Sequence, residues 1–432
     1  RLGEKASLIA GSNRSESGDA PPADPCAPFR GLKILDLSTF WAGAYLTCYM
    51  GALGADVVKV ESIQRPDGHR FSGAMSRDGD DWYERGPLWQ ATNLNKLDIT
   101  LDLSSERGRA IALKLAAAAD VVIENFSPRV VEHFGLDYNA LVPINPDVIM
   151  VRMPGFGLAG PWRDYVGWAL NIEQLAGMSA ATGYPDGPPC NLQGPADPIA
   201  GVHAGVALLA ALDHRRRTGE GQLIEVAQIE VGAAVSAEPL IEYSMNGFVR
   251  GREGNRHRSV AQGVYPASVA DDWVAVSIRD DADWSALAAV MSRPELVGDS
   301  RFRTTALRLD NHEEFDEIVG GWTRGRTADE VVSALSASGI PAERVLTGDR
   351  MYEVPQLDAR GYYQEIDHPI TGRLRYPGWP FHIRPGLRWP HRCSAPTLGQ
   401  HNNEVLGQLG ISDEELNELR AQRIIGEKVL NL

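Results

Sequence analysis

The stretch GLKILDLSTFWAGAYLTCYMGALGADVVKVE, residues 31–61, decides the fold. Its first part, GLKILDL (31–37), is a short apolar run that predicts a buried strand. The next part, WAGAYLTCYMGALG (41–54), has helical periodicity and ends at Gly54. ADVVKVE (55–61) is a second strand, rich in β-branched residues. A strand–helix–strand unit of this kind predicts parallel strands in a sheet that helices cover on both faces.

The same alternation continues along the chain and extends the sheet. Ala-rich and amphipathic stretches predict helices, and short β-branched runs between them predict strands. We expect helices at 104–120 and 197–217 and strands at 120–126, 147–153 and 221–228. The fold class is therefore α/β, with a large Rossmann-like parallel sheet.

The amino-acid composition of the sequence changes after residue 245. NGFVRGREGNRHRSVAQG (246–263) is polar and rich in Gly and Arg, which is typical of a linker. With 432 residues, the chain is long enough for two domains. We expect a flexible N-terminal arm with high Ser, Gly, Asp and Pro content at residues 1–29, and a smaller α+β domain after the linker.

The composition disfavours several classes of function. Lys and Arg total 42 against 57 Asp and Glu, a net charge of −15, which is unfavourable for nucleic-acid binding. The four cysteines form no CxxC pair, so neither a zinc site nor a disulfide framework is expected, and a reducing cytoplasm fits best. No apolar run approaches the roughly 20 residues that span a bilayer, so we expect no membrane partner.

Residues 152–162, RMPGFGLAGPW, contain the G-x-G-x-x-G spacing of dinucleotide-binding loops. Such a loop must join the first strand to its helix, so that the helix N-terminus meets the pyrophosphate. Here Pro161 and Trp162 follow, and the real first strand–helix turn contains only Gly43. We therefore expect no nicotinamide or flavin, and interpret the glycines as allowing a sharp bend.

Several stretches together resemble one family. They are 31–61, NLNKLDITLDL (93–103), ADVVIENFSPRVVEHFGLDYNAL (119–141), PGFGLAGP (154–161), TGYPDGPP (182–189), ADPIAGVHAGVALLAALDHRRRTGEGQLIEV (196–226) and APTLGQHNNEVLGQLG (395–410). In this order they resemble the family III CoA-transferases, the CaiB/BaiF group, which includes formyl-CoA transferase and α-methylacyl-CoA racemase. The resemblance implies a large Rossmann-like, CoA-binding domain made from both ends of the chain, at 30–230 with 340–432, and a small inserted α+β domain at 246–335. It further implies two chains interlocked as rings in a homodimer. It also implies that the loop with Gly155, Phe156 and Gly157 lies close to the active site.

The resemblance implies that Asp197 is the catalytic nucleophile. A carboxylate can carry an acyl group as a mixed anhydride and then CoA as an aspartyl thioester. From the residues alone, an Asp before Pro198 at the start of a helix favours an ordinary N-terminal cap, and only the resemblance favours catalysis. Both roles are compatible, because a helix N-terminus also stabilises negative charge.

The same resemblance implies a set of residues that bind CoA, which enters the reaction as the acyl-CoA substrate. We expect no metal in the site. The alternative for each basic residue is a solvated surface charge. The candidates are Phe40, Trp41, Ala42, Arg65, Arg70, Lys96, Asn125 and Phe126.

The sequence departs from the family in VGWALNIEQLAG (166–177). Racemases carry Gly-His-Asp at the position of Gly167, Trp168 and Ala169, and transferases usually carry an acid at the third position. Ala169 disfavours racemase activity, because it offers no second acid or base. Glu173 is one helical turn further along and is a candidate to compensate. CoA transfer between an acyl-CoA and a free carboxylic acid is thus expected first. The alternatives are an acyl-CoA racemase or isomerase, and a catalytically weak CoA-binding half of a larger fused transferase.

Overall fold

The computed structural model describes residues 27–73, 75–384 and 391–430. The chain forms two compact units, one of residues 1–178, 191–240 and 359–432 and the other of residues 179–190 and 241–358. Most of the predicted arm, residues 1–26, lies outside the described residues. Phe29 donates its N–H to the carbonyl of Leu53 at 3.1 Å, so hydrogen-bonded structure begins before residue 30.

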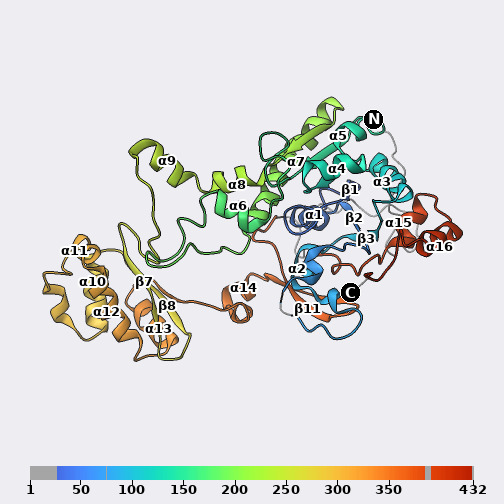
Figure 1. The fold of residues 1–432 in the computed structure, drawn as a ribbon. Helices are drawn as coiled ribbons and strands as arrows, with labels where there is room; N and C mark the ends of the chain where they lie inside the picture. Colours follow the sequence, from blue (N-terminus) through green and yellow to red (C-terminus); the bar gives the residue numbers. More distant parts are fainter. Residues whose placement is uncertain (1–26, 74, 385–390, 431–432) are drawn as a thin grey trace. The chain divides into compact units, whose positions relative to one another are not determined.

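The first unit is built on a six-stranded sheet in which every neighbouring pair is parallel (Figure 1). The strand order is β3-β2-β1-β4-β5-β6. The strands are β1 (Lys33–Asp36), β2 (Asp56–Glu61), β3 (Leu97–Thr100), β4 (Val121–Glu124), β5 (Ile149–Arg152) and β6 (Gln222–Glu225). The chain reverses its direction of winding between β1 and β4, and open α/β sheets bind ligands outside the carboxyl ends of their strands at such a point.

Helices cover both faces of this sheet. Leu35 and Val122 belong to one core cluster and their neighbours Ile34 and Val121 to another, because successive side chains of a strand point to opposite faces. The helices of the first unit are α1 (Ala42–Ala52), α2 (Pro87–Thr92), α3 (Glu106–Ala118), α4 (Pro128–Phe134), α5 (Tyr138–Leu141), α6 (Ala169–Leu175), α7 (Ala196–Thr218), α8 (Gln228–Val235), α15 (Asn402–Gln408) and α16 (Asp413–Ala421). The cluster of Leu35 includes residues of α3, α15 and α16, and the cluster of Ile34 includes residues of α1 and α7.

Helix α7 packs closely against α1 because Gly201 has no side chain. A Cβ atom at Gly201 would lie 2.6 Å from the carbonyl oxygen of Ala42, which is closer than real Cβ contacts allow. This contact brings the second turn of α7 next to the first turn of α1. Helix α7 is long and apolar enough to cross a membrane, although the core helices of other proteins also meet this criterion. The sequence indicated no membrane-spanning segment. Helix α7 contacts α1, α8, β5 and β6, and 33% of its apolar window is buried.

The C-terminal segment joins the same unit. His401 donates its N–H to the carbonyl of Asp98 at 2.9 Å, and the side chain of Asn402 accepts the N–H of Thr100 at 2.9 Å. These bonds fix α15 beside β3 (Figure 1). A hairpin of β10 (Tyr363–His368) and β11 (Gly372–Pro377) precedes them. The sequence did not predict this hairpin or β3.

The second unit has its own small core. Its antiparallel sheet has the order β7-β8-β9, and α10, α12 and α13 contribute to the same apolar cluster. The elements are β7 (Ala261–Pro266), β8 (Trp273–Ile278), β9 (Ala342–Arg344), α10 (Asp281–Val290), α11 (Thr305–Asp310), α12 (His312–Thr323) and α13 (Ala328–Ala337). Helices α9 (Ala237–Asn246) and α14 (Pro355–Ala359) lie at its boundaries with the first unit. Strand β7 begins inside the stretch that the sequence suggested was a linker.

Candidate active site

Two cavities open at the carboxyl ends of the parallel strands in the first unit. One, of about 550 Å³, contains Asp197 and is called the acyl cavity here. The other, of about 580 Å³, lies over the ends of β1, β2 and β3 and is called the strand-end cavity. Thr39, Phe126 and Val130 line both cavities. A long ligand could therefore run from one cavity into the other across the winding switch point.

Asn125 ties the two sides of this switch point together. Its side-chain oxygen accepts the N–H of Thr39 at 2.8 Å, and its amide donates to the carbonyl of Thr39 at 2.7 Å. The loop after β4 is thereby locked to the loop after β1. Asn125 also lines the acyl cavity, and both of these hydrogen bonds join its side chain to the backbone of Thr39.

Phe40, beside Asn125 at the switch point, has a strained backbone. Its φ is +59°, a region that non-glycine residues rarely adopt. The carboxylate of Asp67 holds it there by accepting the N–H of Phe40 at 3.1 Å. Lys59, buried in β2, bonds to that carboxylate at 3.1 Å and to the carbonyl of Ser38. Strain of this kind persists only where the surroundings fix it, and it is concentrated at functional sites.

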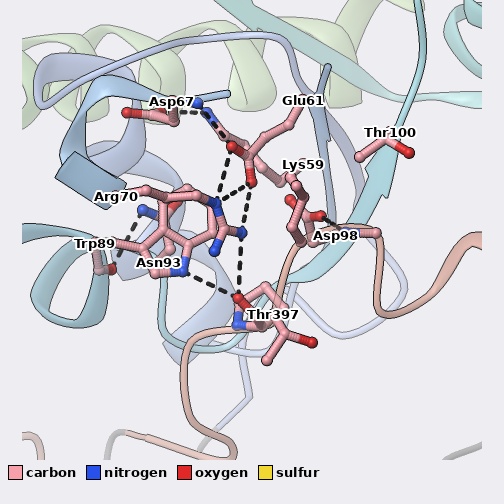
Figure 2. Close-up of polar contacts among 12 residues, drawn as sticks. Lys59, Glu61, Asp67, Arg70, Trp89, Asn93, Asp98, Thr100 and Thr397 are labelled. Carbon is pink, nitrogen blue, oxygen red and sulfur yellow. Dashed lines mark hydrogen bonds and ion pairs between the residues drawn. The ribbon is translucent and has the colours of Figure 1, made fainter. Parts of the chain in front are cut away.

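A second buried network supports the same loop. Figure 2 shows Arg70 between Glu61 and Trp89, beneath Lys59. The guanidinium of Arg70 bonds to Glu61 at 2.6 Å and to Glu84 at 2.5 Å, and it stacks on the Trp89 ring at 3.6 Å. Burial and the neighbouring Glu61 carboxylate raise the pKa of Asp98 well above its ordinary value. The guanidinium of Arg70 compensates the negative charge of the carboxylates that it contacts, as the burial of such charges requires.

Lys96 belongs to a third buried group under helix α1. Its ammonium bonds to Asp36 at 3.2 Å, to Asn93 at 2.8 Å and to the carbonyl of Ala44 at 3.0 Å. Although burial opposes ionisation, Lys59 and Lys96 hold the pKa of Asp36 down to about 2. The pair anchors the start of α1 to β1.

Asp197 is the second residue of α7 and lines the acyl cavity. The residue before the helix is Pro195, so Asp197 does not cap it, which corrects one of the two sequence interpretations. Within the described residues its carboxylate has no hydrogen-bond donor. Burial, together with the carboxylate of Glu173, raises the pKa of Asp197 to about 7. A desolvated carboxylate without hydrogen-bond partners in a cavity is a candidate functional group, because structural carboxylates are normally paired.

Glu173 lies beneath Asp197 on helix α6. It is completely buried, and one carboxylate oxygen accepts the N–H of Ala196 at 3.2 Å. Its other oxygen has no partner among the described residues. Glu173 thus fixes the first turn of α7 and places a second carboxylate beside the first. It is not among the residues that line the acyl cavity, where Ala169 is found.

The glycine loop follows β5 instead of β1. Gly155 lines the acyl cavity, and a Cβ atom there would lie 2.9 Å from the Cα of Gly167. Gly157 has a φ of +86°, and Leu158 donates its N–H to Glu225 at 2.6 Å. Phe156 is buried behind the loop. The glycines therefore allow the backbone to bend sharply and to approach a second loop at the cavity wall.

The structure separates the predicted basic residues. Arg65 is exposed and lines the strand-end cavity. Arg70 and Lys96 are fully buried, line neither cavity and are satisfied by internal partners, so the expectation that they contact CoA directly is corrected to a supporting role. Of the remaining candidates, Phe40, Trp41 and Phe126 line the acyl cavity, whereas Ala42 is buried at the start of α1.

His69 is a cavity residue that the sequence reasoning missed. It contacts the rings of Phe40 and Trp41 edge-on, with centroid distances of 5.7 and 6.0 Å. Burial lowers the pKa of His69 to about 4, so the imidazole is neutral at physiological pH. Its place in an irregular loop gave no periodic signal. No group of three or more His, Cys, Asp or Glu side chains in the described part of the chain could hold a metal ion.

Comparison with known proteins places this site in context. The chain is 32% identical to a succinyl-CoA–D-citramalate CoA-transferase of Chloroflexus aurantiacus over 93% of this chain and 99% of that protein. It is also 32% identical to a probable CoA-transferase of Mycobacterium tuberculosis, of which the match covers 50%. The crystal structure of a CaiB/BaiF family protein from Brucella suis has a TM-score of 0.81 with 30% identity, over 89% of this chain and 100% of that one.

The sequence model of one family matches almost the whole chain. It covers residues 29–402, which include the parallel sheet, Asp197 and both cavities. The related proteins named above are CoA-transferases or members of the CaiB/BaiF family. CoA-transferases act on CoA thioesters, so acyl-CoA is the substrate class that this family brings to the site. The chain belongs to CoA-transferase family III.

Proposed function

We propose that the protein transfers CoA from an acyl-CoA to a free carboxylic acid through covalent intermediates on Asp197. The observation that supports this proposal most directly is the state of that carboxylate. It is desolvated, lacks hydrogen-bond donors among the described residues and has a pKa raised to about 7. Converting it into a neutral acyl derivative removes a charge that burial disfavours, so covalent catalysis relieves part of the desolvation cost.

The first half-reaction exchanges the donor acid for CoA on the enzyme. A carboxylate oxygen of Asp197 attacks the thioester carbonyl, the C–S bond breaks, and CoA thiolate leaves a mixed anhydride. The thiolate then attacks the aspartyl carbonyl and expels the donor acid as its carboxylate. The product is an aspartyl-CoA thioester, in which the activation of the original thioester is retained.

The second half-reaction repeats these steps with the acceptor acid. The acceptor carboxylate attacks the aspartyl thioester, and CoA thiolate leaves a second mixed anhydride. The thiolate attacks the acceptor's carbonyl, which forms the new acyl-CoA and regenerates the carboxylate of Asp197. Water would hydrolyse either intermediate, so a cavity with largely apolar walls protects the reaction.

CoA is proposed to lie across the switch point. The strand-end cavity contains the exposed cation Arg65, which would face the phosphates or the adenine. The pantetheine arm would pass Thr39 and Phe126, which both cavities share, and deliver its sulfur beside Asp197. Replacing Arg65 with Ala should raise KM for acyl-CoA with little change in kcat, because Arg65 lies far from the reacting atoms in this arrangement.

The interlocked homodimer remains a proposal that one surface supports. On α7, Val202, Val206 and Leu209 are between 49% and 66% exposed and recur at helical spacing on one face. An exposed apolar row on a helix otherwise packed in the core is typical of an interface. Sedimentation of the wild type and of Val206→Glu, which should weaken a dimer, tests this assembly. The division into a large and a small inserted domain and a cytoplasmic location are retained as proposals.

The test of the mechanism is capture of the intermediate. The protein is incubated with acyl-CoA in the absence of acceptor, digested, and examined by mass spectrometry for a CoA adduct on the peptide that contains Asp197. Asp197→Asn, which keeps the shape of the side chain, should give no adduct and no transfer. Deuterium exchange at the α-carbon of the substrate without CoA transfer would instead support an isomerase and refute the proposal.

A further inference from the structure

The wall of the acyl cavity has a distinctive composition. Its large apolar side chains from the first strand–helix loop, α2 and residues 165–170 are Phe40, Trp41, Leu88, Tyr165, Val166, Trp168 and Leu170. Apart from Asp197, its polar members are amides, hydroxyls and one histidine. Among the described residues, the lining contains no Lys or Arg, and Asp197 is its only carboxylate.

The charge balance of this cavity bears on the acyl group. When a dicarboxylic acid is joined to CoA, its distal carboxylate remains ionised and must lie near the reacting carbonyl. Here it would meet Asp197 and the buried Glu173 behind it, and the described residues of this chain that line the cavity provide no cation. His69 cannot serve as one near neutral pH, because burial lowers its pKa to about 4. An unpaired buried charge is unfavourable, so the cavity disfavours such a group.

The shape of the wall favours an apolar chain or ring. Phe40 and Trp168 meet edge to face with their centroids 4.7 Å apart, and His69 contacts Phe40 from another side. Tyr165, Trp168 and Leu170 are 59%, 55% and 43% exposed at this wall. An apolar acyl group would cover part of this surface, and aromatic rings pack on each other in such offset and edge-on arrangements.

We infer that the acyl cavity selects the apolar, preferentially aromatic, chain of a monocarboxylic acid and discriminates against dicarboxylic acids. This inference rests on the proposed function, because it assumes that the transferred acyl group lies beside Asp197. It goes beyond that function by assigning the acid's chemical class. Trp168 lies directly before α6 and Leu170 lies in its first turn. Both then determine specificity for the acyl group, because they present an apolar surface to the cavity.

The experiment compares acids of equal length that differ only in the distal group. Hexanoate and adipate are supplied as acceptors with butyryl-CoA as donor, with 3-phenylpropionate as the aromatic member, and CoA esters are separated by chromatography. We expect kcat/KM for hexanoate to exceed that for adipate by at least about tenfold, and that for 3-phenylpropionate to be higher still. Adipate equal to or better than hexanoate would overturn the inference.

Binding separates this inference from the proposed mechanism. Calorimetric titration of Asp197→Asn with hexanoyl-CoA and adipyl-CoA measures the preference of the cavity without chemistry. Tighter binding of hexanoyl-CoA with no transfer by the wild type would uphold the cavity preference and refute the mechanism. Equal binding of the two esters would refute the preference, whatever the rates.

A matched pair of variants tests the missing cation directly. Leu170→Arg places a positive charge at the cavity wall, and it should raise the adipate/hexanoate ratio of kcat/KM by about tenfold or more. Leu175→Arg is the control, since Leu175 is on the same helix and 53% exposed but does not line the cavity. It should leave the ratio unchanged. An equal response of the two variants would show that the effect is not local and would contradict the inference.

Discussion

Replacing the proposed nucleophile with its uncharged isostere, Asp197→Asn, should make the protein more stable at alkaline pH while abolishing transfer. Burial and Glu173 raise the pKa of Asp197 from an ordinary 3.8 to about 7. Each tenfold change in proton affinity corresponds to about 1.4 kcal/mol, so the ionised carboxylate opposes folding by up to about 4 kcal/mol. Water in the cavity screens the charge, and we therefore expect about 2–4 kcal/mol.

The sign follows from proton linkage. Because the folded pKa is raised, the folded state binds more protons than the unfolded chain between about pH 4 and pH 7. The contribution of Asp197 to stability therefore falls as the pH rises through this range and stays low above it. Asn does not titrate, so the variant should match the wild type near pH 4 and exceed it increasingly up to about pH 8.

The assay is urea unfolding of wild type and variant between pH 5 and pH 8.5, where the gap in unfolding free energy should widen with pH. Asp213→Asn is the control on the same helix, because Asp213 is exposed and paired with Arg216 and Arg217. It should give no such gap. A stability difference that is independent of pH, or a variant less stable than the wild type at pH 8.5, would refute the assignment of a destabilising buried charge.

Three further changes test the support of the site. Glu173→Gln keeps the hydrogen bond to the start of α7 but removes a charge of the same sign as that of Asp197. The pH at which the transfer rate falls on the acidic side should therefore decrease, while burial keeps the pKa of Asp197 above 3.8. An unchanged pH–rate profile would contradict this coupling. Gly201→Val should lower the free energy of unfolding by about 1–3 kcal/mol and lower kcat, because the added side chain separates α1 from α7. The control is Gly205→Ala, whose Cβ would meet only a flexible side chain at 3.3 Å. Denaturation and rate assays should show little effect of this second change. Lys59→Met leaves the buried carboxylate of Asp67 without its cation and should lower the free energy of unfolding in urea by about 3–5 kcal/mol. Lys114→Met, on the exposed face of α3, should lower it little. Equal losses in the two variants would argue against the buried network.

The strand–helix alternation from 31 to 228 was readable from local pattern alone. Buried strands such as Val121–Glu124 are continuous apolar runs bounded by polar residues, and a parallel sheet follows from strands separated by helices. The resemblance to the family III CoA-transferases could also be recognised from the sequence, because it depends on short motifs that occur in the same order along the chain. The hairpin β10–β11 was missed because its strands are half exposed and lie in a Pro-rich region, where the pattern is weak.

The sequence by itself determined the kind of fold and the family, since both depend on short-range patterns and on the order of motifs, and the resemblance supplied Asp197 as the proposed nucleophile. Only the tertiary structure decided which charges are available to a ligand. Arg65 and Arg70 lie five residues apart and look alike in sequence, yet one is exposed and the other is enclosed by Glu61, Glu84 and Trp89. Likewise, the raised pKa of Asp197 comes from burial and from Glu173, 24 residues away in the chain. Desolvation and charge pairing act through space, so the order of residues along the chain does not contain them.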